Sequence, residues 1–285
     1  MAAGHAETAP AKVNLTLRVL GRRADGYHEI DSLVVFAGVG DELSFAQGAE
    51  LALTVTGPTA SAAGEISDNL VLKAARALVA RVEGLAVGSF ALSKRLPVAA
   101  GLGGGSSDAA AALRLLARAN GIALDDPRLM QAAQVTGADV PVCLDPRPRR
   151  MRGIGDILSE PLDIPKLPAV LVNPGVAVPT REVFAALNLK PGAQAADAPP
   201  PPAALLDEIS SCRNDLEEPA IELQPVIAEV LAVLRKLPGC RLSRMSGSGA
   251  TCFGLFEATH AAEAAARMLH VGYPRWWVRA TVFGG

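Results

Sequence analysis

The stretch Pro97–Leu113 reads PVAAGLGGGSSDAAAAL, and four of the five residues in Gly101–Gly105 are glycines that stand directly before an alanine-rich run. Glycine is about 1 kcal/mol less favourable than alanine inside a helix, so their presence here needs a reason. Glycines leave backbone N–H groups accessible, and the first turn of a helix has unpaired N–H donors at the positive end of its dipole. The pattern of extended chain, glycine loop and helix start therefore predicts an anion site suited to phosphate. The hydroxyls of Ser106 and Ser107 can cap the helix, contact phosphate or bind a metal ion.

Two common phosphate-binding loops do not match this stretch. The P-loop requires a lysine after its last glycine, and no lysine follows these glycines. The dinucleotide pattern G-x-G-x-x-G fails because its third glycine falls on Ser106 or Asp108, depending on the frame. A tight structural turn with a serine N-cap remains the alternative to a phosphate site.

The composition is that of an ordinary globular protein. The chain has 285 residues, half of them hydrophobic, and a net charge of −2, which gives no reason to expect nucleic acid or a membrane as partner. No apolar run is long enough to span a bilayer, and the first ten residues lack the apolar core of a signal peptide. The four cysteines are widely spaced and form no C-x-x-C pair, so we expect reduced thiols in a cytoplasmic protein: Cys143, Cys212, Cys240 and Cys252.

Periodicity predicts two α+β domains, 1–160 and 161–285, rather than a regular alternation of strands and helices. Residues 9–20 alternate, with Lys12 and Asn14 on the polar side of a half-buried strand. Further strands are expected at 27–38, 50–56, 88–93, 168–173, 251–256 and 276–282. Helices are expected between Ser67 or Asp68 and Gly84, and at 106–120, 125–137, 180–187, 218–237 and 259–270.

Two segments lie outside these elements. Residues 191–202, PGAQAADAPPPP, are rich in proline and predict a mobile loop. Met151 and the arginines around it predict a solvated loop, and the sequence assigns no role to this basic segment, 147–152.

Three short motifs occur in an order that resembles the GHMP kinases. They are PAKVNLTL near the N-terminus, the glycine loop, and SGSGATCFGLF, which begins at Ser246. The resemblance implies a ribosomal-S5-like N-terminal domain, a ferredoxin-like C-terminal domain, ATP as phosphate donor and Mg²⁺ as its partner ion. It also implies that the phosphates lie on the glycine loop: Pro97, Val98, Ala99, Ala100, Gly101, Leu102, Gly103, Gly104, Gly105, Ser106 and Ser107.

Further segments narrow the resemblance within that superfamily. DNLVLKAA, GADVPV and NPGVAVPTREVF occur in the order typical of the 4-diphosphocytidyl-2-C-methyl-D-erythritol kinases. That resemblance implies phosphorylation of a hydroxyl of a CDP-linked methylerythritol in the non-mevalonate route to isoprenoid precursors. The basic stretch 144–156 and the proline-rich loop depart from the pattern we expect of these kinases.

Phosphoryl transfer to an alcohol needs a positioned hydroxyl, an acceptor for its proton and stabilisation of developing charge. Asp139 in GADVPV has apolar neighbours and should need a cation or several donors, and Lys12 is a suitable cation. The resemblance assigns Asp139 as the base and Lys12 as the charge stabiliser. A structural acid and a solvated lysine are the alternatives.

Substrate recognition is expected from an aromatic residue beside a histidine. Tyr27 and His28 follow a turn-prone Asp-Gly pair, and an aromatic face can stack on a pyrimidine while imidazole bonds to its polar edge. The resemblance implies that Tyr27, His28 and Phe184 serve the cytosine. Asn14 can either reach the substrate or support Lys12. Tyr27 and Phe184 could instead be core aromatics.

The expected partner is thus a small molecule with a cytidine diphosphate moiety. No metal ligand is assigned, and Ser107 is only a candidate for Mg²⁺. Another GHMP kinase of homoserine or mevalonate type is one alternative, although a small aliphatic substrate offers no base for Tyr27 and His28. A catalytically silent nucleotide-binding regulator is another, and the presence of both Lys12 and Asp139 argues against it. The oligomeric state is not predicted.

Overall fold

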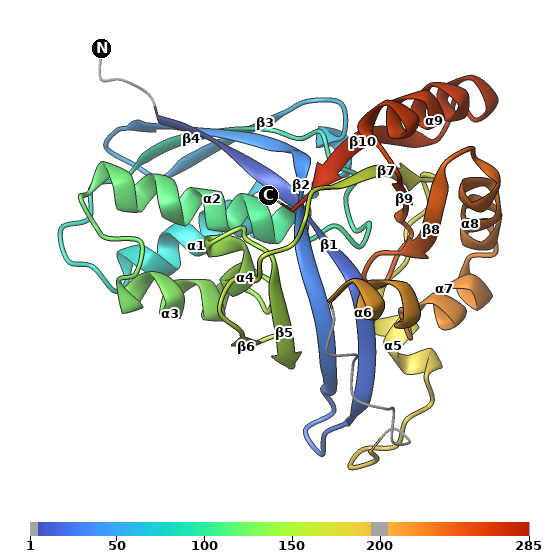
Figure 1. The fold of residues 1–285 in the computed structure, drawn as a ribbon. Coiled ribbons are helices and arrows are strands. Elements are labelled where there is room, and N and C mark those ends of the chain that lie inside the picture. Colours follow the sequence, from blue (N-terminus) through green and yellow to red (C-terminus); the bar gives the residue numbers. More distant parts are fainter. Residues whose placement is uncertain (1–4, 195–204, 285) are drawn as a thin grey trace. The chain divides into compact units, whose positions relative to one another are not determined.

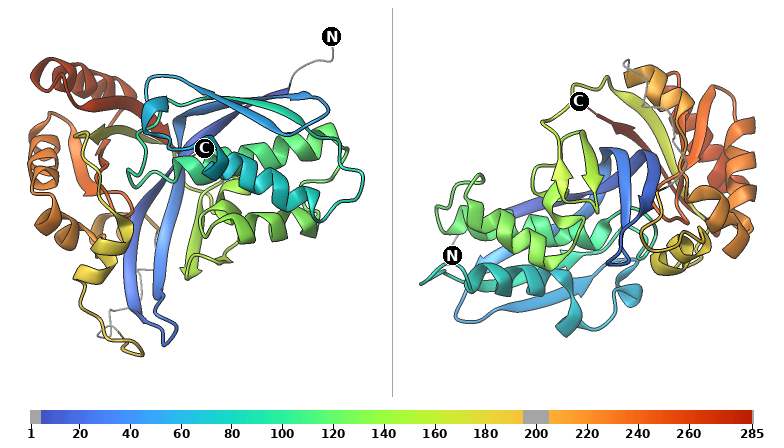
Figure 2. Two further views of the ribbon diagram at one scale, coloured as in Figure 1. Left: turned by 180° about the vertical axis from the view of Figure 1, so that it is seen from behind. Right: turned by 90° about the horizontal axis from the view of Figure 1, so that it is seen from below.

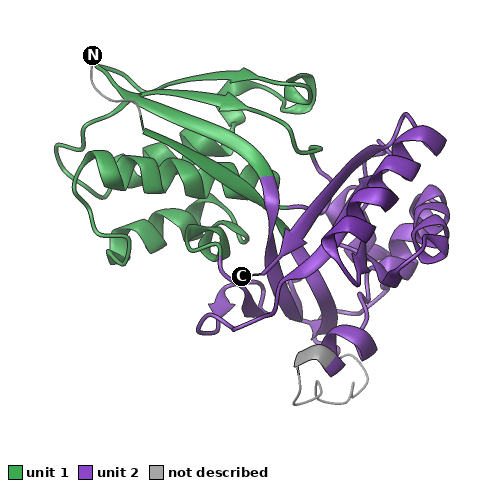
Figure 3. Ribbon diagram, turned by 45° about the horizontal axis from the view of Figure 1, so that its top comes forward, with its two compact units in different colours: residues 1–12, 40–98, 103–146 green, residues 13–39, 99–102, 147–285 purple. Residues whose placement is uncertain are grey.

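The structure is a computed structural model that describes residues 5–194 and 205–284 (Figure 1). Its contacts divide the chain into two compact units (Figure 3). Unit 1 comprises residues 1–12, 40–98 and 103–146, and unit 2 comprises residues 13–39, 99–102 and 147–285. The units are interleaved along the chain, so they do not correspond to one cut in the sequence. A domain boundary near residue 160 stays a prediction.

Unit 1 contains one sheet. Strand β1 (His5–Arg22) pairs with β2 (His28–Gln47), and both strands continue into unit 2. The end of β2 is antiparallel to β4 (Gly88–Ser93), which is parallel to the edge strand β3 (Ala52–Thr56). Alternating small and apolar side chains along β4 leave one face of the sheet buried and the other exposed.

Helices cover the buried face of this sheet: α1 (Leu70–Val79), α2 (Gly104–Ala119), α3 (Pro127–Thr136) and α4 (Val140–Leu144) (Figures 1 and 2). Helix α2 is buried on all sides from Ser107 to Ala117, because its alanines let neighbouring elements approach closely. In the described part of the chain, no helix combines the length and apolar character needed to cross a membrane.

The predicted helix between residues 67 and 84 is shorter than expected at both ends. Ile66–Asp68 form a 3₁₀ turn, so Asn69 is the N-cap, and its side chain accepts a hydrogen bond from the Val71 N–H. The helix ends at Val79, before Gly84. The predicted start of the helix, with Ser67 or Asp68 as its N-cap, was therefore wrong, because these two residues belong to the 3₁₀ turn that precedes the helix.

Unit 2 contains an antiparallel set of strands in the order β10 (Trp277–Phe283), β7 (Leu167–Asn173), β9 (Cys252–Phe256) and β8 (Cys240–Met245). Helices α8 (Val226–Lys236) and α9 (Thr259–Gly272) pack against these strands (Figure 2). The remaining helices are α5 (Thr180–Ala186), α6 (Leu205–Ser211) and α7 (Glu217–Leu223).

The single helix predicted at 218–237 is two helices, α7 and α8. They are separated at Gln224, and Pro225 is the N-cap of α8. Proline lacks the N–H that a continuous helix requires, so the chain restarts there. Most of the predicted mobile loop, residues 195–202, lies outside the described residues.

The basic segment is a strand and not a solvated loop. Arg149–Gly153 form β5, which pairs with β2 and with β6 (Ile157–Leu158). Met151 is 2% exposed. Arg150 forms ion pairs with Asp31 and Glu208. Acidic partners that are distant in sequence neutralise the arginine, and the alternation of a strand turns Met151 to the inside.

Strand β1 is also more buried than its alternation predicts. All residues from Ala11 to Leu17 are buried, including Lys12 and Asn14 on the side expected to be solvated. The prediction of a half-buried strand was therefore wrong for residues 11–17. The Lys12 ammonium and the Asn14 amide nitrogen have hydrogen-bond partners in the protein, which offset part of the cost of burial.

Candidate active site

The glycine loop leads into α2 through a left-handed residue. Gly103 is the N-cap, with φ of 58°, and no side chain caps the helix. A Cβ on Gly103 would lie 3.2 Å from Cβ and Cε of Lys12, so a side chain there would press on the lysine stem. The first turn of α2 thus begins beside Lys12, with its N–H donors uncapped by any side chain.

Gly104 and Gly105 have a different environment. Neither has a positive φ, and a Cβ on either would make only ordinary contacts at 3.5 Å. Packing and backbone conformation therefore do not require glycine at these two helical positions, although glycine is disfavoured in helices. Space for a ligand above the start of α2 would explain why both positions are glycine.

The two loop serines do not cap the helix. Ser107 Oγ donates to the Pro10 carbonyl oxygen at 2.7 Å, and the residue is fully buried. Its hydroxyl joins α2 to β1, which gives it a structural contact. Ser106 is partly exposed and lies in the first turn.

The part of the loop in unit 2 meets the third motif of the sequence. Ser246 Oγ donates to the Gly101 carbonyl oxygen at 2.8 Å and accepts from the Asn14 N–H at 3.1 Å. Gly101 has φ of 74°, and a Cβ there would lie 2.2 Å from the Ser246 carbonyl oxygen. The SGSG segment therefore supports the loop. Asn14 also donates to Ser32 Oγ, and its Oδ1 is buried without a partner.

The remaining loop residues vary in exposure. Leu102 and Ala100 are buried, and Ala99 adopts a left-handed φ of 51°. Pro97 and Val98 are partly exposed at the entry to the loop.

The structure brings Lys12 and Asp139 together. Lys12 Nζ donates to Asp139 Oδ2 at 2.8 Å, with the lysine side chain 6% exposed and the aspartate side chain 35% exposed. Asp139 occupies the N-cap of α4, just after Gly137 ends α3, but its side chain makes no capping bond. One carboxylate is thus held by a buried cation and remains accessible from outside.

His28 and Phe184 form a ring pair in unit 2. Their centroids are 4.8 Å apart with 30° between the ring planes. Burial, followed by the nearby Arg22 charge, lowers the pKa of His28, and its Nε2 is buried without a hydrogen-bond partner. Tyr27 is 61% exposed and belongs to neither this ring pair nor the core. The neutral imidazole of His28 and the exposed ring of Tyr27 thus belong to neighbouring residues in the sequence.

Sequence reasoning missed a buried cluster of Asp41, Lys94 and Asp108 at the start of α2. Lys94 Nζ donates to Asp108 Oδ2 at 2.8 Å and to Asp41 Oδ2. Asp41 Oδ1 also accepts from the backbone N–H groups of Arg95 and Leu96. The cluster therefore holds the chain before the loop against the helix after it. Lys94 and Asp108 flank the glycines, but their pairing has no local sequence signal.

Burial raises the pKa of Asp108 to about 7; Lys94 lowers it in part, and Asp41 raises it further. For Lys94, burial alone would lower the pKa, but the two carboxylates outweigh it and the net shift is upward. The cluster is thus two carboxylates that share one lysine.

The four cysteines are free thiols in the structure. Cys143 and Cys252 are fully buried, and burial raises the pKa of Cys143 to about 12. Among the described residues, no group of three or more His, Cys, Asp or Glu side chains is placed to hold a metal ion.

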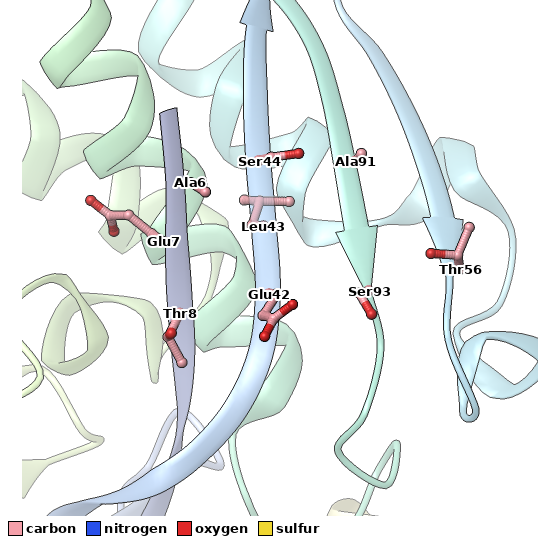
Figure 4. Close-up of a pocket in the computed structure, with 9 residues that line it drawn as sticks. All are labelled: Ala6, Glu7, Thr8, Glu42, Leu43, Ser44, Thr56, Ala91 and Ser93. Carbon is pink, nitrogen blue, oxygen red and sulfur yellow. The ribbon is translucent and has the colours of Figure 1, made fainter. Parts of the chain in front are cut away.

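A groove of about 460 Å³ lies on the exposed face of the unit 1 sheet (Figure 4). It runs over β1, β2, β4 and β3, and residues from all four strands line it: Ala6, Glu7, Thr8, Glu42, Leu43, Ser44, Thr56, Ala91 and Ser93. None of the predicted site residues is among these.

Comparison with known proteins places these features in a family. Residues 69–145 match the family described as GHMP kinases N terminal domain, and residues 202–273 match GHMP kinases C terminal. A protein of Xanthobacter autotrophicus named 4-diphosphocytidyl-2-C-methyl-D-erythritol kinase is 58% identical over 285 residues, covering 96% of this chain and 97% of that protein.

Solved structures agree. A crystal structure of 4-(cytidine 5'-diphospho)-2C-methyl-D-erythritol kinase is 36% identical with a TM-score of 0.81, over 99% of this chain and 100% of the other. Homoserine kinase from Cytophaga hutchinsonii is similar in fold alone, at 19% identity and a TM-score of 0.70, over 99% of this chain and 95% of the other. The predicted two-domain GHMP kinase fold of α+β class is confirmed, and the chain belongs to the GHMP kinases and, within them, to the 4-diphosphocytidyl-2-C-methyl-D-erythritol kinase family.

Proposed function

We propose that this chain uses ATP to phosphorylate a hydroxyl of 4-diphosphocytidyl-2-C-methyl-D-erythritol, a step toward isoprenoid precursors. The observation that carries the chemistry is the pair of buried Lys12 and accessible Asp139, 2.8 Å apart beside the uncapped start of α2. The family relationship supplies the substrate class. Phosphoryl transfer depends mainly on positioning and charge stabilisation, and this arrangement offers both.

The residues fit a bound triphosphate. The glycines at 104 and 105 are not explained by packing, and the helix start presents N–H donors that no side chain occupies. ATP supplies the transferred phosphoryl group when it is bound. We propose Pro97–Ser107 as the segment that holds its phosphates. The Ser107 hydroxyl donates to the Pro10 carbonyl oxygen of β1, so in this proposal it supports the loop and does not contact phosphate.

Asp139 is the base in this proposal, and Lys12 sets its electrostatic environment. The carboxylate accepts the proton of the substrate hydroxyl while that oxygen forms its bond to the transferred phosphorus and the bond from this phosphorus to the departing ADP oxygen breaks. The Lys12 ammonium holds the Asp139 carboxylate through its hydrogen bond and stabilises negative charge that develops on the attacking oxygen. Because Lys12 is buried, its charge is screened little by water.

Tyr27, His28 and Phe184 would hold the cytosine. The unpartnered His28 Nε2 is the group that a base edge can satisfy, and the exposed Tyr27 ring offers a stacking face. Asn14, whose Oδ1 also lacks a partner, is the proposed contact to the rest of the substrate.

Mg²⁺ in this proposal binds largely through phosphate oxygens and water, as is typical of the ion in kinases. The absence of a three-ligand cluster among the described residues is compatible with that mode. A cytoplasmic location, and the lack of nucleic-acid or membrane partners, are proposed from the charge and composition.

Steady-state kinetics on a panel of alcohols tests the function. ADP release is followed with the CDP-linked methylerythritol, homoserine and mevalonate at matched concentrations of enzyme and Mg-ATP. We expect kcat/KM for the cytidine substrate to exceed that for the others by roughly 10³ or more, since a site built for a base leaves polar groups unpaired without one. Comparable values for homoserine or mevalonate would instead support another GHMP activity.

A further inference from the structure

Arg114 is a buried arginine in the middle of α2 that none of the chemistry above uses. The residue is 8% exposed, and it projects from a helix in which most neighbours are alanine or leucine. Buried guanidinium groups need partners for their donors, so its contacts show what it holds.

Its donors reach two other elements of unit 1. Nη1 donates to the Cys143 carbonyl oxygen at 2.7 Å and to the Leu144 carbonyl oxygen at 3.5 Å, at the C-terminal end of α4. Nε donates to Glu7 Oε2 at 2.6 Å on β1, and Nη2 lies 3.5 Å from the Thr8 carbonyl oxygen. Arg114 therefore ties α4 to β1.

These two elements carry the proposed catalytic pair. Lys12 lies on β1, and Asp139 is the N-cap of α4. Helix α4 has five residues, so it is too short to be stable by itself and its orientation depends on outside contacts. A cation at the carbonyl end of a helix is also favourable to its dipole.

The spacing along α2 strengthens this arrangement. Ser107 and Arg114 are seven residues apart, two helical turns, and so lie on one face of α2. Ser107 bonds to Pro10 of β1, and Arg114 bonds to Glu7. The same helix thus fixes β1 at two points and α4 at one.

We propose that Arg114 is a positioning residue that sets the geometry between Asp139 and Lys12 by clamping α4 to β1. The proposal rests on the proposed function of that pair. The contacts described for Arg114 are with other residues of β1 and α4 and not with Lys12 or Asp139 themselves. Losing its bonds would let α4 tilt and move the Asp139 carboxylate, and a shift of about 1 Å can cost roughly 10²-fold in rate.

Arg114→Met tests this, because it keeps much of the volume and removes all donors. We expect kcat to fall by about 10- to 100-fold, with KM for both substrates within about threefold of wild type. Arg118→Ala is the matched control. Arg118 bonds to the same Glu7 carboxylate at 2.5 Å but is half exposed and makes no bond to α4, so its kcat should stay within about twofold.

A second variant separates positioning from stability. Arg114→Met leaves the largely buried Glu7 carboxylate with Arg118 as its one remaining ion-pair partner among the described residues, so the protein should lose thermal stability. Glu7→Gln combined with Arg114→Met removes that charge. We expect its Tm to recover toward wild type while kcat stays low. Recovery of kcat in parallel with Tm would overturn the proposal.

A double-mutant cycle with Asp139→Asn gives the final readout. If Arg114 acts through Asp139, then Arg114→Met should change kcat less than about threefold once Asp139 is already Asn. A full additional loss of about 10- to 100-fold would contradict the proposal. If the wild type is active and the effects of Arg114→Met and Asp139→Asn on kcat are additive, only the role of Arg114 is contradicted. If the wild type does not phosphorylate the cytidine substrate, the proposed function is contradicted. A crystal structure of Arg114→Met with the Lys12–Asp139 distance unchanged would also overturn the inference.

Discussion

At the scale of single residues, a contribution to the stability of the fold is a poor explanation for the ion pair between Lys12 and Asp139. Exposed ion pairs contribute about 0–1 kcal/mol, and burying an ammonium is costly unless several partners compensate. Lys12 is 4% exposed, yet the carboxylate it meets remains about a third exposed. Burial with a single, accessible partner is expected where a charge is held ready for an incoming group.

Asp139→Asn should lower kcat by about 10²–10⁴, the range for loss of a positioned general base. KM for the alcohol should change little, because the amide can still hydrogen-bond a hydroxyl. Single-turnover phosphorylation measures the chemical step, and thermal unfolding of the same preparation reports folding. A stable variant with near wild-type turnover would falsify the catalytic role.

Phe184→Ala and Tyr27→Ala should each raise KM for the cytidine substrate by roughly 5- to 150-fold, since stacking on a base is worth about 1–3 kcal/mol. KM for ATP should stay within about twofold. Tyr273→Ala is the control, because Tyr273 stacks on Trp276 at 3.9 Å and belongs to no predicted site. An equal loss for ATP and the cytidine substrate would mean that the rings serve the fold.

At the scale of the elements, the start of α2 combines a helix N-terminus with glycines that packing does not require. Gly105→Ala tests what they are for. Alanine is about 1 kcal/mol more favourable than glycine within a helix, so Tm should stay level or rise. KM for ATP should rise roughly fivefold or more if phosphate approaches this backbone.

Gly272→Ala is the matched control for that change. Gly272 is the last residue of α9, has no positive φ, and offers open space around the position that a Cβ would take. It should gain similar stability and leave KM for ATP unchanged. Equal KM values for ATP in Gly105→Ala and wild type would show that the phosphates do not bind at the first turn of α2.

The cluster of Asp41, Lys94 and Asp108 predicts a pH dependence of stability. The folded-state pKa of Asp108, about 7, lies above its ordinary value of 3.8, so folding takes up a proton between these pH values. Its stabilising contribution is full below about pH 4 and is lost as pH rises through about 7. Asp108→Asn cannot ionise, so its Tm relative to wild type should be higher at about pH 8 than at about pH 5. A constant Tm difference across that range would show that Asp108 is already ionised at the lower pH.

At the scale of the whole molecule, the sequence was most informative where chemistry depends on short local patterns. The glycine loop predicted the start of α2 to within two residues, and the GADVPV and PAKVNLTL motifs predicted the pair of Asp139 and Lys12, which the structure joins. Each signal lies within a few consecutive residues.

The rest depends on partners that are far apart in the sequence. Arg150 was predicted to be solvated because Asp31 and Glu208 lie 119 and 58 residues away along the chain. The Asp41–Lys94–Asp108 cluster and the contacts of Arg114 were missed for the same reason. Hydrophobic periodicity predicts which face of a helix or strand is buried, but it does not predict which distant residue contacts that face. Buried ion pairs are therefore the features that periodicity predicts least well.

Transfer of label from γ-labelled ATP by the purified wild-type chain is the most direct test of the central claim. The cytidine substrate, homoserine and mevalonate are offered together, and the double variant Lys12→Met/Asp139→Asn serves as the blank. We predict label in the CDP-linked methylerythritol, one equivalent for each ADP formed, and none above the blank in the other two alcohols. Label in homoserine or mevalonate instead, or ADP release without labelled cytidine product, would contradict the claim.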